Sequence, residues 1–118
     1  MNNIYTSLEQ SKKLLDLGID INTADIYLYE GTDGNYYPEF PIERDCGDIP
    51  SWSLNSLLNM IKNRKDCNKV ELLSNYASKW VLTTTYYDSV WKEKEIIAEY
   101  LLDSAFEMVC WLKENNKL

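Results

Sequence analysis

Residues 79–112 read KWVLTTTYYDSVWKEKEIIAEYLLDSAFEMVCWL, and the architecture of the protein follows from them. Residues 79–87 alternate between two sets of side chains and are rich in β-branched and aromatic residues, which predicts a β-strand. From Leu101 to Leu112 the apolar residues instead recur every three or four positions, which predicts a helix. Its apolar arc is broad, so we expect this helix to be central and to pack across a sheet.

Residues 70–74 form a second predicted strand just upstream, and a polar turn joins it to the first. The two strands predict a β-hairpin over residues 70–87. Residues 93–100 fit either a third strand at about 94–98 or an early start of the last helix, and both alternatives stay open. We therefore expect an α+β fold, in which a small antiparallel sheet of this hairpin and one or two further strands is packed by about three helices.

Two shorter helices are predicted before the hairpin. The first covers about residues 7–17, opens on a capping box from Thr6 to Glu9, and ends at Gly18, which supplies a left-handed residue. The second begins after Ser53, whose side chain is a favoured N-cap, and continues with apolar residues at helical spacing.

A short strand is predicted between these two helices, at residues 26–30. It runs into a strong turn signal at residues 31–35. The following extended segment contains Pro38 and Pro41, which restrict it to an edge strand or a loop. From there to Pro50 we expect a long surface loop, and loops of this length are often functional.

The composition is that of one globular domain over residues 1–118. Hydrophobic residues make up 45% of the chain and charged residues 26%, which disfavours disorder. No apolar run approaches the ~20 residues of a membrane span, and the N-terminus lacks the pattern of a secretion signal. Cys46, Cys67 and Cys110 are odd in number and form no Cys-x-x-Cys pair, which favours free thiols. We expect a cytoplasmic protein that does not associate with membranes.

The net charge of −7 lies in the first half of the chain, since residues 1–50 contain three basic and ten acidic side chains. Direct binding to nucleic acid needs clustered Lys and Arg, so nucleic acid is not expected as a direct ligand. One basic cluster does occur, at Lys62, Arg64, Lys65 and Lys69. It stands at a predicted helix end without interleaved aromatic residues, which favours a structural role.

Catalytic groups are sparse in this sequence. There is no histidine, which removes Ser-His and Cys-His nucleophile activation and the commonest metal ligand. Cys46 has acidic neighbours that oppose thiolate formation, so an inert thiol is favoured. Residues 20–31 begin like a calcium loop but lack its glycine and its final glutamate, which favours a solvated acidic surface. We expect neither cofactor nor resident metal; a small carboxylate- or metal-dependent hydrolase or transferase is the alternative.

The chain is also rich in aromatic residues, with nine tyrosines and four tryptophans. We expect Trp80 and Phe106 in the core. The tyrosines of about residues 20–48 are interspersed with carboxylates, and two interpretations stay open. They belong either to a contact surface, where Tyr and Trp are enriched, or to a half-exposed sheet face. The candidate partner-binding residues are Asp25, Tyr27, Tyr29, Glu30, Asp33, Tyr36 and Tyr37.

Three segments carry a resemblance to a known family: IYTSLEQSKKLL at residues 4–15, PSWSL at 50–54 and LDSAFEMVCWLKEN at 102–115. In this order, and over most of the chain, they resemble short uncharacterised proteins from gut Bacteroides and their phages and mobile elements. Members have no assigned activity, so the resemblance implies a context and no mechanism. Many relatives open the last helix with Asn-Pro, where this chain has Tyr100-Leu101, which leaves the start of the helix open.

These features together favour a non-enzymatic protein-interaction module, which the resemblance would make an accessory protein of a mobile element. Its acidic, tyrosine-rich segment would contact a basic protein partner or a second copy of the chain. One variant of this hypothesis is mimicry of nucleic acid, with carboxylates in the places of phosphates. A structural homo-oligomer is the remaining alternative.

Overall fold

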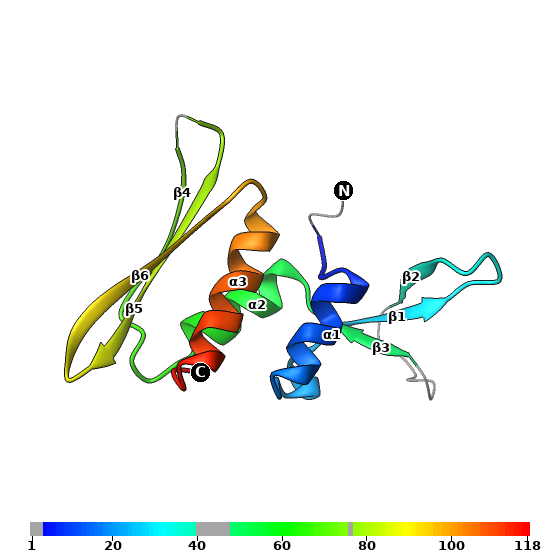
Figure 1. Cartoon of the computed structure of the whole chain (residues 1–118), viewed down its shortest axis with the longest axis horizontal. Helices are drawn as coiled ribbons and strands as arrows, with labels where there is room; N and C mark the ends of the chain where they lie inside the picture. The colour runs from blue at the N-terminus through cyan, green and yellow to red at the C-terminus, as the bar shows by residue number, and fades with distance from the viewer. Residues whose placement is uncertain (1–3, 40–47, 76) are drawn as a thin grey trace.

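The computed structural model describes residues 4–39, 48–75 and 77–118, and it confirms the α+β class with two three-stranded antiparallel sheets. The elements are α1 (Leu8–Asp16), a 3-10 helix η1 (Ile21–Thr23), β1 (Ile26–Glu30), β2 (Tyr36–Glu39), β3 (Ile49–Ser51), α2 (Leu54–Lys62), β4 (Val70–Ser74), β5 (Trp80–Asp88), β6 (Val90–Ala98) and α3 (Leu101–Glu114). The α-helices lie between the two sheets along the 50 Å long axis (Figure 1). Within the described ranges, no helix combines the length and the apolar character needed to cross a membrane.

The predicted hairpin over residues 70–87 is confirmed, because β4 and β5 pair antiparallel with Leu72 opposite Leu82. The segment that the sequence left open is also a strand: β6 pairs with β5 along its whole length, so the sheet has the order β4-β5-β6. Helix α3 begins only at Leu101. Tyr100 before it has extended backbone, with φ −118° and ψ 141°, and thereby separates strand from helix.

Helix α3 is central, as its broad apolar arc predicts. It contacts β5 and β6 on one side and α2 on the other. Ala105 and Met108 on this helix are fully buried. Phe106 is partly buried and packs against the same core, whereas Trp80 at the start of β5 is only half-buried. The fully buried tryptophan is instead Trp52, just before α2.

The N-terminal strands form a sheet of their own, where the sequence predicted a single small sheet. The strand predicted at residues 26–30 is the middle strand of the order β2-β1-β3. Both edge strands contain a proline, Pro38 in β2 and Pro50 in β3, and an edge is where a missing N–H is tolerated. The strand β3 was missed because three residues carry too little periodicity. Residues 40–47 of the predicted loop lie outside the described residues.

The N-cap of helix α1 is Ser7, one residue later than the predicted cap Thr6. The Ser7 hydroxyl accepts the Gln10 backbone N–H at 3.2 Å, and the Gln10 side chain accepts the Ser7 N–H at 3.0 Å. The capping box predicted from Thr6 to Glu9 is therefore wrong. The prediction failed because Thr6 takes part in a tertiary contact instead. Its buried hydroxyl accepts the backbone N–H of Trp52 at 3.0 Å, so it does not cap the helix.

The predicted end of α1 is confirmed. Gly18 has φ +83°, a left-handed conformation that favours glycine. The Ile19 N–H donates to the Leu14 carbonyl at 3.0 Å, and the Gly18 N–H donates to the Leu15 carbonyl at the same distance. These two bonds define a Schellman motif, which turns the chain so that Ile19 is buried in the same core as Leu14.

Candidate functional site

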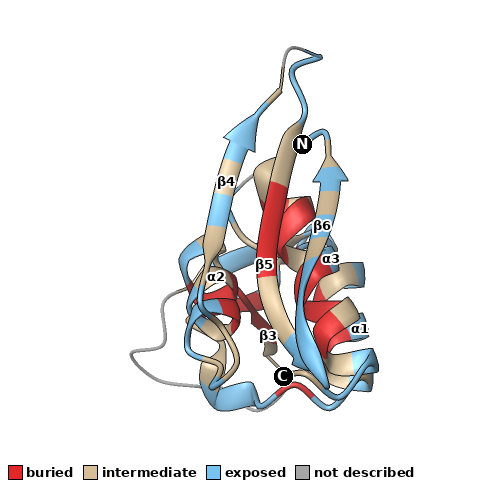
Figure 2. Cartoon of the chain, turned by 90° about the vertical axis from the view of Figure 1, so that its left-hand side faces the viewer, coloured by how far each residue is buried: buried red, intermediate tan, exposed pale blue. Residues whose placement is uncertain are grey.

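Helix α3 covers one face of the β4-β5-β6 sheet, and no element among the described residues covers the other face. On the covered face, Leu82 and Thr84 of β5 are fully buried. Side chains alternate along a strand, so the odd-numbered residues of β5 point the other way. Figure 2 looks onto that side of the sheet and shows β4 and β6 exposed along much of their length. We call this surface the open face; it is formed by the odd-numbered residues 71–73 of β4, 81–87 of β5 and 91–97 of β6.

Large apolar side chains gather at both ends of the open face. At one end, Leu73, Val81 and Ile97 stand opposite one another across the three strands. At the other end, Tyr87 stands opposite Trp91, and their ring centroids are 5.5 Å apart in an edge-to-face arrangement. Leu73, Ile97 and Trp91 are each more than half exposed, at 54%, 51% and 53%. Exposed apolar side chains gathered in this way mark contact surfaces in soluble proteins.

Carboxylates occupy the middle of the open face. Glu71 and Glu95 lie on either side of Thr83, and Glu93 lies beside Thr85. Glu93 accepts a hydrogen bond from the Lys69 ammonium at 2.7 Å, and this bond raises the pKa of Lys69. Among the described residues, neither Glu71 nor Glu95 forms an ion pair within 4 Å, although the charge of Glu71 also helps to raise the pKa of Lys69. The middle of the face is therefore acidic, while its ends are apolar.

Strand β6 sorts its charges between the two faces of the sheet. The alternation of Lys92, Glu93, Lys94 and Glu95 puts both glutamates on the open face and both lysines on the α3 side. Lys94 accordingly lies over the ring of Trp111 in α3, with its ammonium 4.9 Å from the ring centroid. The acidity of the open face is thus a consequence of the strand register.

The structure separates the seven predicted partner-binding residues. Tyr27 is buried, at 6% exposure. The Asp25 carboxylate accepts the backbone N–H of Ser53 at 2.8 Å and also the Ser53 hydroxyl. Because Ser53 in turn caps α2 through the N–H of Ser56, Asp25 holds the start of that helix in place. These two residues serve the fold.

The other predicted residues lie on the β1–β2 hairpin, which we call the tyrosine hairpin. Tyr29 stands opposite Tyr37, with ring centroids 5.8 Å apart, while Glu30 and Tyr36 form the next pair. The Tyr37 hydroxyl donates to the Asp33 carboxylate. This bond lowers the pKa of Asp33, with help from the Asn35 N–H, and raises the pKa of Tyr37.

The tip of the tyrosine hairpin is shaped by Gly31. A Cβ atom at this position would lie 2.7 Å from a ring carbon of Tyr37, so the ring packs directly on the glycine backbone. Tyr29, Asp33 and Tyr37 then line a shallow groove of about 470 Å³. The tip presents hydroxyls, ring edges and carboxylates, a combination suited to binding a basic side chain.

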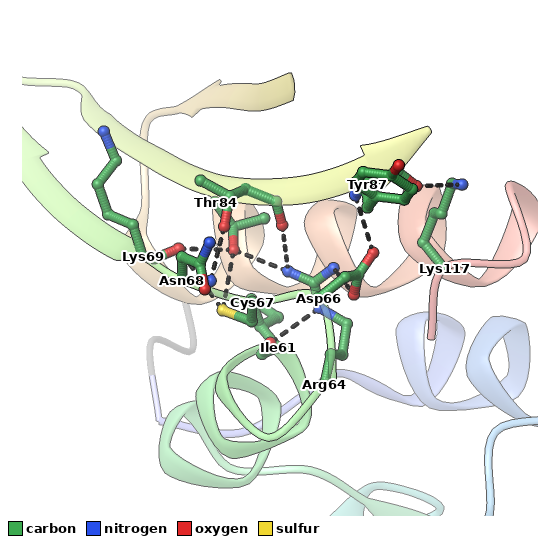
Figure 3. A network of polar contacts seen from close by, with 10 residues as sticks. Ile61, Arg64, Asp66, Cys67, Asn68, Lys69, Thr84, Tyr87 and Lys117 are labelled. Atoms are coloured by element: carbon green, nitrogen blue, oxygen red, sulfur yellow. Dashed lines mark hydrogen bonds and ion pairs between the residues drawn. The ribbon is translucent and has the colours of Figure 1, made fainter. Parts of the chain in front are cut away.

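The four side chains of the basic cluster differ in their exposure and in their partners. The Arg64 side chain is 4% exposed; its guanidinium pairs with Asp66 at 3.2 Å and donates to the Ile61 carbonyl, the Thr84 hydroxyl and the Thr85 carbonyl at 2.8–2.9 Å (Figure 3). These bonds connect the end of α2 to β5. Arg64 therefore has a structural role, as the sequence favoured for the cluster, whereas Lys69 forms an exposed ion pair with Glu93 and Lys62 and Lys65 are exposed.

The described thiols and acidic side chains show no arrangement that points to a reaction. Cys67 and Cys110 are free thiols, and burial raises the pKa of Cys110 to about 11, so this thiol stays protonated at neutral pH. The Asp20 carboxylate accepts the Asn22 N–H and caps η1. In the part of the chain that the structure describes, no three metal-ligating side chains converge. Cys46 lies outside the described residues.

Sequence reasoning missed the open face, although its signals were present. The two faces of residues 79–87 were assigned, but nothing local tells which of them a helix covers. The alternation of Lys and Glu at residues 92–95 would have identified a strand with one acidic side, had the segment been assigned as a strand. Comparisons of the chain with protein-family models, with curated proteins and with solved structures found no match.

Proposed function

We propose that this protein is a protein-interaction module and that the open face of the β4-β5-β6 sheet is its main contact surface. The observation that carries the proposal is the exposure of Leu73, Trp91 and Ile97 on one side of a sheet whose core lies on the other side. Each side chain leaves apolar area in water, and covering that area releases about 25 cal/mol per Å². At the other end of the face, the Tyr87–Trp91 pair consists of the two aromatic residues that are enriched in binding hot spots.

The partner meets the face of the sheet and not its β6 edge. An exposed edge strand invites another strand to pair with it, and charged side chains, especially inward-pointing lysines, discourage this pairing. Strand β6 carries Lys92 and Lys94 on its inner side. The outer side of the same strand carries Trp91 and Ile97, so the apolar contacts are offered through side chains.

The tyrosine hairpin is proposed as a second contact surface. Tyr29 and Tyr37 are 40% and 39% exposed, and Glu30 and Asp33 add negative charge beside them. The hairpin and the open face lie at opposite ends of the long axis (Figure 1), so two partners can be held at the same time. A cytoplasmic location and a role as accessory protein of a mobile element belong to this proposal; the sequence resemblance supports the latter.

The test compares the proteins captured from the source organism by immobilised wild-type chain and by two variants. Ile97→Asp places a charge in the apolar end of the open face, and Ile21→Asp makes the same change at an exposed site in η1. We expect Ile97→Asp to lose the specific partner and Ile21→Asp to keep it, with both variants folded by circular dichroism. Equal capture by the wild type and Ile97→Asp would remove the open face from the proposal.

The hairpin is tested in the same experiment with Tyr29→Ala combined with Glu30→Lys. Both side chains lie on the exposed end of β1, so the fold tolerates the change. Loss of a partner that Ile97→Asp still captures assigns that partner to the tyrosine hairpin. A capture pattern identical to that of the wild type would show that the hairpin is not a contact surface.

A further inference from the structure

We infer that the partner of the open face is a basic amphipathic helix of another protein, with apolar residues at both ends and Lys or Arg between them. The inference rests on the proposed function, because it names the partner of the same surface. It depends on two properties of the face: the spacing of its apolar ends and the carboxylates between them.

The spacing sets the length of the partner. Trp91 and Ile97 mark the two apolar ends and are six residues apart on β6. At about 3.3 Å per residue in a strand, the ends are about 20 Å apart. A helix rises 1.5 Å per residue, so about 13 residues span the same distance. Helix α3, which has 14 residues and packs on the opposite face, shows that this sheet accommodates such a helix.

The carboxylates set the charge of the partner. Any element that reaches both apolar ends also covers Glu71 and Glu95, neither of which forms an ion pair within 4 Å among the described residues. Burying a carboxylate without a counter-charge is strongly unfavourable because its hydration is lost, so the covering element must supply cations. Lys69 already pairs with Glu93 and acts on Glu71 only through its charge, without an ion pair. The partner therefore needs about two Lys or Arg residues in its middle turns.

A second copy of this chain does not meet these requirements. The open faces of two copies would bring Glu71 and Glu95 together with the same residues of the other copy. Charge complementarity thus favours a different, basic protein over self-association.

The experiment selects peptides from a phage library of random 16-residue sequences on immobilised wild-type protein, after depletion on Ile97→Asp. The selected peptides are synthesised, and their dissociation constants are measured by fluorescence anisotropy at low and high salt. We expect peptides with apolar residues near both ends and net positive charge between them. Their affinity should fall with salt, and Glu71→Gln combined with Glu95→Gln should weaken binding roughly tenfold. The matched control is Glu9→Gln with Glu107→Gln, which removes the same charge from exposed sites on α1 and α3.

The outcomes separate the inference from the proposed function. Peptides that require Ile97 but are neutral or acidic, or that bind the Glu71→Gln, Glu95→Gln variant as tightly as the wild type, would overturn the basic helix and keep the open face as a contact surface. A concentration-dependent dimer in light scattering that Ile97→Asp abolishes would likewise replace the helix with a second copy. Failure to enrich any peptide that depends on Ile97 counts against both.

Discussion

At the scale of single residues, the position of a carboxylate along the chain says little about its role. Asp25 and Asp33 belong to the same acidic segment, yet Asp25 fixes the start of a helix and Asp33 closes a turn at an exposed hairpin tip. The difference arises from Ser53, 28 residues away from Asp25. Only folding brings this hydroxyl and this N–H to the carboxylate.

Replacing Asp25 with alanine should lower the free energy of unfolding by about 1–2 kcal/mol, because the Ser53 N–H and hydroxyl lose a charged acceptor. Urea denaturation followed by circular dichroism measures the change. The control Glu107→Ala, at an exposed position of α3, should stay within about 0.5 kcal/mol of the wild type. An Asp25→Ala variant as stable as this control would contradict the structural role.

The Tyr37 hydroxyl should be visible in the titration of Asp33. Replacing Tyr37 with phenylalanine removes the largest cause of the lowered pKa, so the pKa of Asp33 should rise toward its ordinary value of 3.8. Because the folded pKa is depressed, the bond stabilises the fold above the unfolded pKa and is lost as the pH falls through the folded value. Carboxyl NMR titration of both proteins measures the shift; an unchanged pKa would mean that the bond does not persist in solution.

At the scale of elements, the arginine contacts show what joins helix α2 to the sheet. The Arg64 guanidinium reaches carbonyl and hydroxyl oxygens on both elements, and its partner Asp66 also accepts the backbone N–H of Tyr87 at 3.1 Å. A planar donor group with several N–H directions is needed for this arrangement. The lysine ammonium has the charge but not the geometry.

Replacing Arg64 with lysine should therefore destabilise the protein by about 2–3 kcal/mol, although the charge is kept. The neighbouring substitution Lys65→Ala, at an exposed position, should change stability by less than about 0.5 kcal/mol. Chemical denaturation of both variants provides the comparison. Equal stability of Arg64→Lys and the wild type would show that charge alone suffices at this junction.

At the scale of the whole molecule, the two faces of the β4-β5-β6 sheet differ in what their apolar side chains contribute. Leu82 on the covered face is fully buried, and Ile97 on the open face is half exposed. Apolar residues on the covered face stabilise the fold through packing. On the open face, the same kind of side chain contributes little until a partner covers it.

The two faces predict opposite responses to the same kind of truncation. Leu82→Ala should cost about 2–5 kcal/mol of unfolding free energy through the cavity that it leaves. Ile97→Ala should cost less than about 1 kcal/mol, since much of its side chain is already in water. Thermal and urea unfolding measure both. A loss at Ile97 as large as the loss at Leu82 would show that the open face is part of the folding core.

Local sequence patterns predicted much of this fold. The hairpin over residues 70–87, the end of α1 at Gly18 and the central α3 all depend on contacts within a few residues or on a long apolar stripe, so spacing alone reveals them. The candidate site was predicted only in part. The tyrosine hairpin lies within one contiguous segment, whereas the open face joins three strands whose neighbours are set by pairing.

By itself, the sequence determined the class of the protein, the end of α1 at Gly18, the N-cap of α2 at Ser53, the acidic character of its first half and the lack of histidine. The tertiary structure alone decided that the strands divide into two sheets, that Asp25 and Arg64 hold elements together, and that α3 covers one face of β4-β5-β6 and leaves the other open. The physical reason is that periodicity reports which side chains share a face, while burial depends on which element packs there. That choice is made by contacts between residues far apart in the chain.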